Sequence, residues 1–149
     1  MSNIYPAWWN TSLTIYNKYT DKQTKIDRWY KSTVNGAFWK YAGDKVTIGQ
    51  TVLQTNNIIC RIRKDDKFLE DYLWKALPND QMLEHFTLQG GDIIVKGIVD
   101  DVIDEYTAGS RSSDLLKKYK EQQGCMKIEV VQLNVDGGRG QEHYYVKGI

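Results

Sequence analysis

A chain of 149 residues has the length of one domain, because domains usually run to about 100–200 residues. Hydrophobic residues make up 41% of the chain and charged residues 26%, which excludes disorder throughout. No apolar run approaches the roughly 20 residues that a membrane-spanning helix needs, so no membrane span is expected. The first residues carry neither a basic nor an apolar signal region, which predicts an intracellular site of synthesis.

The charges are unevenly distributed along the chain, although the net charge is only +1. Residues 1–75 hold 12 Lys and Arg against 7 Asp and Glu, net +5, whereas residues 76–149 hold 8 against 12, net −4. The small total excludes gross basicity as a source of nucleic-acid affinity. The opposite halves can instead meet between neighbouring copies in an assembly. The side chains assigned to that contact are Arg61, Arg63, Asp100, Asp101, Asp104 and Glu105.

Residue types that carry catalysis or bind metals are sparse. Cys60, Cys125, His85 and His143 lie far apart and form neither a CxxC nor a histidine motif, so ordinary core or surface positions are expected. The carboxylates of residues 100–105 lack the pattern of a calcium loop, which favours a solvated acidic rim. We therefore expect no catalytic residue, no metal, no cofactor and no enzymatic activity.

The N-terminal third predicts strands. Residues 13–19 alternate between apolar and polar side chains with the period of a strand. Two β-prone runs, 26–34 and 37–42, flank Asn35-Gly36, the dipeptide typical of a two-residue hairpin turn. The expected structure is therefore a first strand followed by a tight hairpin.

The middle of the chain first loses this pattern and then regains it. Residues 43–57 are rich in Gly, Thr, Gln and Asn, and we predict a long polar loop with weak strand character. Alternation returns in residues 58–63, where Ile58, Cys60 and Ile62 share one face. Cys60 is then a small buried hydrophobe, a common role of free cysteine.

The second half predicts short strands and one helix. Pro78 prevents a continuous helix across residues 64–85, and residues 89–92 predict a tight turn that leads into a strand at residues 93–95. A helix is expected over residues 112–123, with a serine cap at its start and Gly124 after its end.

The last strands, residues 126–135 and 143–147, are joined by the glycine-rich residues 136–140. Their buried face changes phase at Val130-Val131, which predicts a β-bulge or a strand shared between two sheets. Because an open meander leaves unpaired edges, we predict one mainly β domain over residues 1–149. It is a small closed or nearly closed barrel of about six to eight strands, with one short inserted helix and a long loop.

The chain holds an unusual number of aromatic residues: 5 Trp, 10 Tyr and 3 Phe. Trp8 and Trp9 stand in an aromatic leader, residues 1–10, and two adjacent indoles cannot both point into one core from a strand. At least one is expected to be exposed or docked on a partner, and both are assigned to partner docking.

Basic and aromatic residues also interleave in residues 25–31 and 38–41. Such a face can stack single-stranded bases, whereas in the alternative interpretation the lysine stems cover the rings of a core hairpin. The residues of the nucleic-acid hypothesis are Arg28, Trp29, Trp39 and Lys40.

Four segments follow one another in a recognisable order, separated by the polar residues 43–57 and by longer intervals. They are Leu13-Thr-Ile-Tyr16, Gly36-Ala-Phe-Trp-Lys-Tyr41, Ile58-Ile-Cys-Arg-Ile-Arg63 and Gly91-Asp-Ile-Ile-Val-Lys-Gly97. By this order and spacing the chain resembles the head-closure, or head–tail joining, proteins of tailed bacteriophages, in particular small structural proteins of phages of Gram-positive hosts. The resemblance covers residues 11–135 and departs from the family at the leader, between Arg63 and Phe86, and over residues 108–124.

The resemblance implies a barrel assembled as a homo-oligomeric ring in the virion, at the head–tail interface, after assembly in the bacterial host cytoplasm. The ring would close the DNA-filled head, contact the portal or adaptor ring on one side and meet tail proteins on the other. It also implies that the loop of residues 43–57 points into the channel and gates genomic DNA through transient contacts. The uncharged loop residues carried over to that role are Thr47, Gln50, Thr51, Gln54, Thr55 and Asn56. Tail completion or another neck position, and a single-stranded nucleic-acid-binding barrel, are the alternatives.

Overall fold

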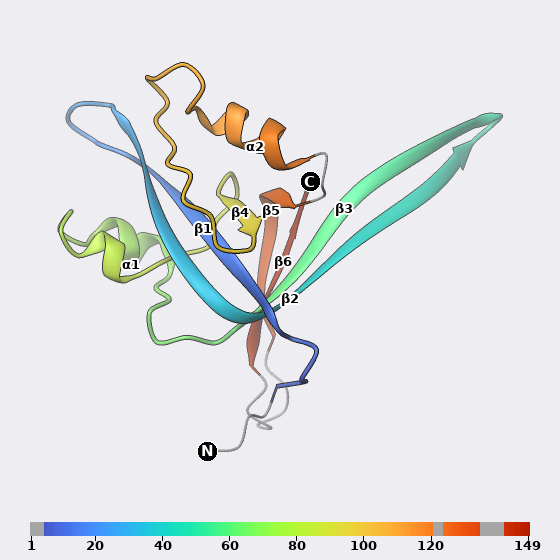
Figure 1. Ribbon diagram of the computed structural model, residues 1–149, viewed down its shortest axis with the longest axis horizontal. Coiled ribbons are helices and arrows are strands. Elements are labelled where there is room, and N and C mark those ends of the chain that lie inside the picture. The colour runs from blue at the N-terminus through green and yellow to red at the C-terminus, as the bar shows by residue number, and fades with distance from the viewer. Residues whose placement is uncertain (1–4, 121–123, 135–141) are drawn as a thin grey trace.

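The computed structural model describes residues 5–120, 124–134 and 142–149, and for residues 42–48 and 51–56 it describes the backbone. The described strands are β1 (Thr11–Thr20), β2 (Asp27–Ile48), β3 (Thr51–Arg63), β4 (Ile93–Lys96), β5 (Cys125–Asn134) and β6 (His143–Gly148). They close into an antiparallel barrel in the order β1-β2-β3-β6-β5-β4 (Figure 1). The mainly β fold and the small closed barrel are therefore confirmed.

Two α-helices and one 3-10 turn accompany the barrel in the described part of the chain. They are α1 (Asp71–Lys75), α2 (Ser112–Lys120) and η1 (Met82–Glu84). α2 confirms the predicted helix up to Lys120, while residues 121–123 lie outside the described residues. An acidic first turn and a lysine-rich last turn both complement the dipole of this helix.

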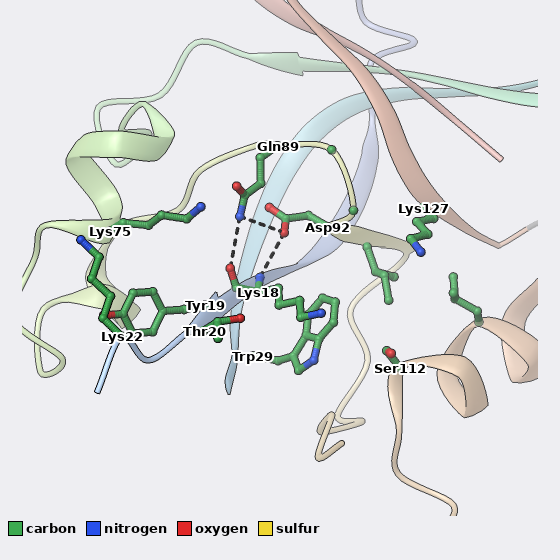
Figure 2. Close-up of a pocket in the computed structure, with 14 residues that line it drawn as sticks. Lys18, Tyr19, Thr20, Lys22, Trp29, Lys75, Gln89, Asp92, Ser112 and Lys127 are labelled. Carbon is green, nitrogen blue, oxygen red and sulfur yellow. Dashed lines mark hydrogen bonds between the residues drawn. The ribbon is translucent and has the colours of Figure 1, made fainter. Parts of the chain in front are cut away.

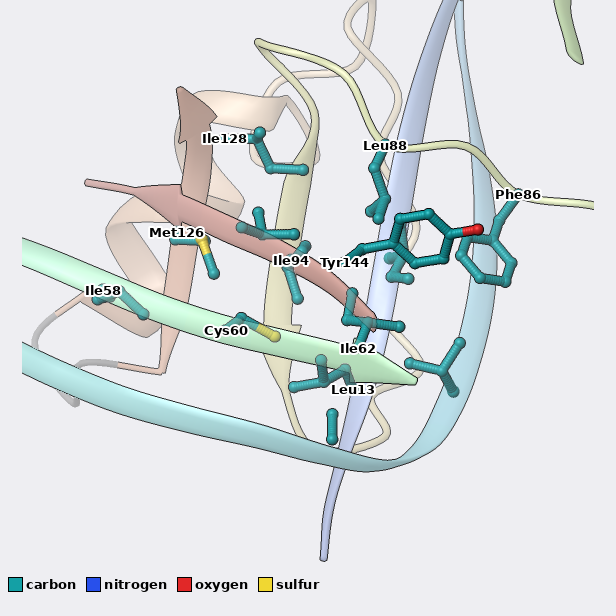
Figure 3. Close-up of a cluster of buried hydrophobic side chains, with 14 residues drawn as sticks. Leu13, Ile58, Cys60, Ile62, Phe86, Leu88, Ile94, Met126, Ile128 and Tyr144 are labelled. Atoms are coloured by element: carbon teal, nitrogen blue, oxygen red, sulfur yellow. The ribbon is translucent and has the colours of Figure 1, made fainter. Parts of the chain in front are cut away.

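The barrel interior is filled by side chains that alternate inward along the strands (Figure 3). Ile58, Cys60 and Ile62 of β3 are buried there, as their alternation predicts. Cys60 is fully buried, which confirms its role as a small hydrophobe. The same cluster includes Leu13, Ile94, Met126 and Val146 from four other strands.

A second cluster lies on the other face of β4. Ile93 and Val95 belong to it, whereas Ile94 belongs to the barrel interior. Leu115 of α2 and Ile103 complete the cover over this face. Because both faces are covered, β4 is a continuous apolar run instead of an alternating one.

α1 is anchored on the barrel by Trp74, which is fully buried. Its ring packs edge-on against Tyr19 and Tyr30, with centroid distances of 6.3 and 5.6 Å. The indole N–H donates a hydrogen bond of 3.2 Å to the carbonyl oxygen of Met82. This anchor holds the next residue, Lys75, close to the β1–β2 pair.

The Asn35-Gly36 pair is not a hairpin turn, so that prediction was wrong: β2 runs through it without a break. Residues 11–13 of β1 face residues 34–37 of β2, so β2 carries one extra residue at this point. Gly36 has a φ of 70°, the left-handed backbone that a glycine bulge uses. The bulge lies where β2 leaves β1, and from Phe38 onward β2 pairs with β3. The positive φ expected of Asn-Gly is therefore used to bend a strand instead of to close a hairpin.

β5 is shared between two partners, as its change of phase predicts. Its residues 125–127 pair with β4, and residues 128–134 pair with β6. The register slips between Ile128 and Val130, which confirms the expected β-bulge. The predicted loop of residues 136–140 lies outside the described residues.

Candidate functional site

The segment predicted as a polar loop, residues 43–57, is a two-stranded hairpin, so that prediction was wrong. β2 and β3 pair in unbroken register out to Ile48 opposite Thr51. The turn is Gly49-Gln50, where Gly49 has a φ of 63°, as a two-residue hairpin turn requires. The overlooked signal was the β-branched character of residues 46–48 and 51–52, which favours strands on both sides of that glycine.

We call residues 42–57 the arm, because they project from the barrel in Figure 1. β2 pairs with β1 only up to Ala37, and β3 pairs with β6 only from Ile58. Beyond these points the two strands of the arm pair with each other alone among the described strands. Isolated two-stranded ribbons are marginally stable, and unpaired edges invite another chain.

The residues assigned to a channel loop all fall in the arm. Thr47 lies in β2, and Gln50 lies in the turn, where it is exposed. The others, Thr51, Gln54, Thr55 and Asn56, lie in β3. Apart from Gln50, their side chains lie outside the described residues.

The structure separates the two leader tryptophans. Trp8 is 67% exposed, whereas Trp9 is only 8% exposed. The Trp9 ring stacks on Tyr5 at 5.4 Å and meets His143 edge-on at 5.1 Å. The Arg63 guanidinium donates a 3.1 Å hydrogen bond to the carbonyl oxygen of Trp9. The assignment to partner docking is therefore corrected for Trp9, which packs within its own chain, and stays a prediction for Trp8.

Trp9→Ala is expected to lower the free energy of unfolding by about 3–5 kcal/mol, because it empties a buried aromatic site. Trp8→Ala is expected to change it by less than about 0.5 kcal/mol, because an exposed ring is lost without leaving a cavity. Urea unfolding of both variants checks this difference. Equal losses would return Trp8 to the core of the domain.

The two arginines assigned to a contact between subunits have partners within the chain. Arg61 donates to Nε2 of His143 at 2.7 Å, and its guanidinium lies 5.0 Å from the Tyr145 ring centroid. Arg63 lies 4.9 Å from the ring centroid of Tyr5, in addition to its bond with the leader. These contacts tie β3 to β6 and to the leader.

Two of the acidic residues assigned to a contact between subunits, Asp101 and Glu105, bond to α2 or to the segment before it. Asp101 accepts hydrogen bonds from Nζ of Lys118 at 2.7 Å and from the Tyr119 hydroxyl at 2.6 Å, and these bonds lower the pKa of its carboxyl. Glu105 accepts from the Trp29 indole at 3.1 Å and from a backbone N–H of α2 at 2.9 Å. Both carboxylates therefore hold the segment before α2 in place.

The remaining two acids, Asp100 and Asp104, are exposed. Asp104 caps the turn that follows it, and hydrogen bonds from the backbone N–H of Tyr106 and the hydroxyl of Thr107 lower its pKa. The structure does not gather the six assigned charges. The arginines contact β6 and the leader, whereas Asp101 and Glu105 form hydrogen bonds to α2.

A cleft of about 470 Å³ opens between β1, the turn before β4, α1 and α2 (Figure 2). Four lysines from separate segments line it: Lys18, Lys22, Lys75 and Lys127. Trp29 forms part of its wall, and Asp92 is the one acidic lining residue among those described. Sequence reasoning missed this cleft because its cationic residues lie far apart in the chain. We call it the lysine cleft.

Asp92 is buried in the wall of the lysine cleft, with 1% of its surface exposed. Its carboxylate accepts hydrogen bonds from Nδ2 of Asn17 at 2.8 Å, the backbone N–H of Lys18 at 3.0 Å and Nε2 of Gln89 at 3.4 Å. Burial raises the pKa of this carboxyl to about 7, and the hydrogen bonds only partly offset that cost.

Asn17, also fully buried, completes this network. It donates to the carbonyl oxygen of Thr87 at 2.6 Å and accepts from the Thr87 N–H at 3.2 Å. The signal for this network was an Asn within the buried half of a predicted strand and an Asp directly after Gly90-Gly91.

The four residues of the nucleic-acid hypothesis are not brought together. Trp29 packs against the cluster under α2, whereas Trp39 packs against the barrel interior. The two indoles are ten residues apart on one strand, a contour of roughly 33 Å. Arg28 and Lys40 are exposed beside them. The structure therefore does not support a single nucleic-acid-binding face made of these four residues.

Within the described residues, no three His, Cys, Asp or Glu side chains gather as they would to hold a metal ion. None of the described helices is long and apolar enough to cross a bilayer.

The fold and its surface define a small, mainly β barrel with a projecting hairpin and a lysine-lined cleft. The chain belongs to a family of unknown function (DUF6751), whose model matches residues 8–149. No curated protein and no solved structure gives a significant match to the chain.

Proposed function

We propose that the protein is a ring-forming structural component of the neck of a tailed bacteriophage, which closes the DNA-filled head and joins it to the tail. The observation that carries the proposal is the arm, whose strands have no partner beyond each other among the described strands. A ribbon of this kind is stabilised when a neighbouring subunit covers it. The small closed barrel and the order of its segments agree with the head-closure proteins that the sequence resembles.

The composition of the arm supports a place beside DNA without tight binding. Asp44 and Lys45 are its charged residues and cancel each other, and most others are Thr, Gln, Asn, Gly or aliphatic. Affinity for a phosphate backbone comes chiefly from Lys and Arg, so such an arm contacts DNA only transiently. This property suits a channel through which the genome must later leave.

The partners in this proposal are other copies of the chain, a portal or adaptor ring on the head side and tail proteins on the other. Trp8 is the docking residue proposed for one of these neighbours, because its large ring is exposed next to the firmly packed Trp9. Tail completion, or another position in the neck, is the alternative within the same class.

The oligomeric state tests the proposal. In analytical ultracentrifugation we expect the purified full chain to form a closed oligomer, alone or when mixed with adaptor protein. Electron microscopy of the particles that contain the chain is expected to place a ring between head and tail. A strictly monomeric chain at every concentration, with and without neck proteins, would contradict the proposal.

A further inference from the structure

The lysine cleft concentrates positive charge that the fold neutralises only in part. Lys18 pairs with Asp27 at 3.8 Å and Lys75 with Asp71 at 3.1 Å, both at partly exposed positions where ion pairs are weak. Within the described residues, Lys22 and Lys127 form no ion pair.

Asp92, the acid that lines the cleft, does not cancel this charge. The carboxylate of Asp92 is buried behind the cleft surface, and its oxygens accept hydrogen bonds from Asn17, Lys18 and Gln89. The four lysines, in contrast, line the cleft from β1, the turn after it, α1 and β5, with Lys22 and Lys75 on one side and Lys127 on the other (Figure 2). The cleft therefore presents several cations to an anionic ligand.

Trp29 adds a flat apolar surface to the same wall. Its indole N–H is held by Glu105 at 3.1 Å, which fixes the ring, and Nζ of Lys18 lies 6.0 Å from its centroid. An aromatic platform beside lysines is the usual pairing for binding single-stranded nucleic acid, where the ring stacks on a base and the cations contact phosphates. A volume of about 470 Å³ lies within the range of small-ligand pockets.

We infer that the lysine cleft binds a nucleotide unit, either free or within a single strand, with its phosphates against the lysines and its base against Trp29. This site differs from the four-residue face of the nucleic-acid hypothesis, with which it shares only Trp29. The inference does not depend on a position in the phage neck, so each can fail without the other.

Fluorescence anisotropy of a labelled oligothymidylate at low salt, with the full-length chain, tests the inference. We compare Lys22→Ala/Lys127→Ala with Lys117→Ala/Lys120→Ala, a control that removes two exposed lysines of α2 outside the cleft. The cleft variant is expected to bind about tenfold more weakly, and its salt dependence to fall by about 1.4 in log–log slope, since each single-strand phosphate contact contributes about 0.7. The control variant is expected to bind as the wild type does.

Competitors separate the two sources of the ligand. Displacement by a thymidine mononucleotide indicates a free nucleotide, and displacement only by an unlabelled oligonucleotide indicates a strand. Trp29→Phe is expected to weaken nucleotide binding several-fold without changing competition by inorganic phosphate. Circular dichroism confirms that each variant is folded.

Three results would overturn the inference. The first is that the wild type binds neither the oligothymidylate nor the mononucleotide at low salt. The others are an equal loss of affinity in the two double-lysine variants, or inorganic phosphate competing as well as the nucleotide.

Discussion

Replacing residues 43–56 by Asn-Gly is expected to leave a folded barrel that no longer assembles. Ala42 and Asn57 are registered partners, so a two-residue turn can join them without changing the ladder below. Among the described strands, β2 beyond Phe38 pairs only with β3, and β3 before Ile58 pairs only with β2, so we expect a thermal unfolding midpoint within a few degrees of that of the wild type. The proposed ring is expected to dissociate to monomers, because the arm provides the unpaired strands.

Analytical ultracentrifugation and thermal unfolding measure these two effects separately. The matched control replaces only Gly49-Gln50 by Asn-Gly, which keeps the arm at full length. In phage particles the trimmed chain is expected to give heads that leak DNA, measured as nuclease-sensitive genome. Normal assembly of the trimmed chain would remove the arm from the subunit contact, and unchanged DNA retention would remove its gating role.

We expect the wild type to lose stability relative to the Asp92→Asn variant as the pH rises from 5 to 7. The measured quantity is the difference between their free energies of unfolding. The pKa of Asp92 is about 7 in the folded chain and 3.8 ordinarily, so between these values the folded state binds more protons than the unfolded state. Stability therefore decreases with rising pH across this window and levels off above it. The relative change from pH 5 to pH 8 is expected to be about 2–3 kcal/mol.

Asp92→Asn removes this titration, but it also lowers the free energy of unfolding by an amount that does not depend on pH. Its amide NH₂ would meet the Nδ2 donor of Asn17, which leaves buried donors unpaired at about 1–3 kcal/mol. Urea unfolding of wild type and variant at pH 5, 6, 7 and 8 gives the difference. Asp104→Asn is the control. Because the pKa of Asp104 is lowered, its contribution to the free energy of unfolding is lost only in more acidic solution, so this variant is expected to differ from the wild type by a constant amount between pH 5 and pH 8. A pH-independent difference between wild type and Asp92→Asn would contradict the burial of an ionisable carboxyl at this site.

Local patterns predicted the parts of the fold that depend on neighbours in sequence. The alternation of Ile58, Cys60 and Ile62 gave the inward face of β3, because side chains of a strand point alternately to its two sides. The serine-rich segment predicted to start a helix does so, since Ser112 is the first residue of α2, and the change of phase near Val130 marked the bulge in β5.

The same reasoning failed where a local preference allows two structures. Asn35-Gly36 supplies positive φ equally well to a hairpin turn and to a bulge, and β2 uses it for a bulge. Residues 43–57 were predicted as a loop because Gly, Thr, Gln and Asn interrupt the apolar alternation there. Pairing between β2 and β3, which depends on both strands at once, decided that structure.

The sequence by itself determined a mainly β fold and favoured a closed or nearly closed barrel, since the period-2 pattern and the cost of open edges are properties of the chain. Only the tertiary structure decided which strand extends into the arm, which tryptophan of the leader is exposed, and how Asn17 meets Asp92. It also decided that Lys22 and Lys127 face one cleft. These features join residues far apart in the chain, and strand register together with barrel closure sets their distances.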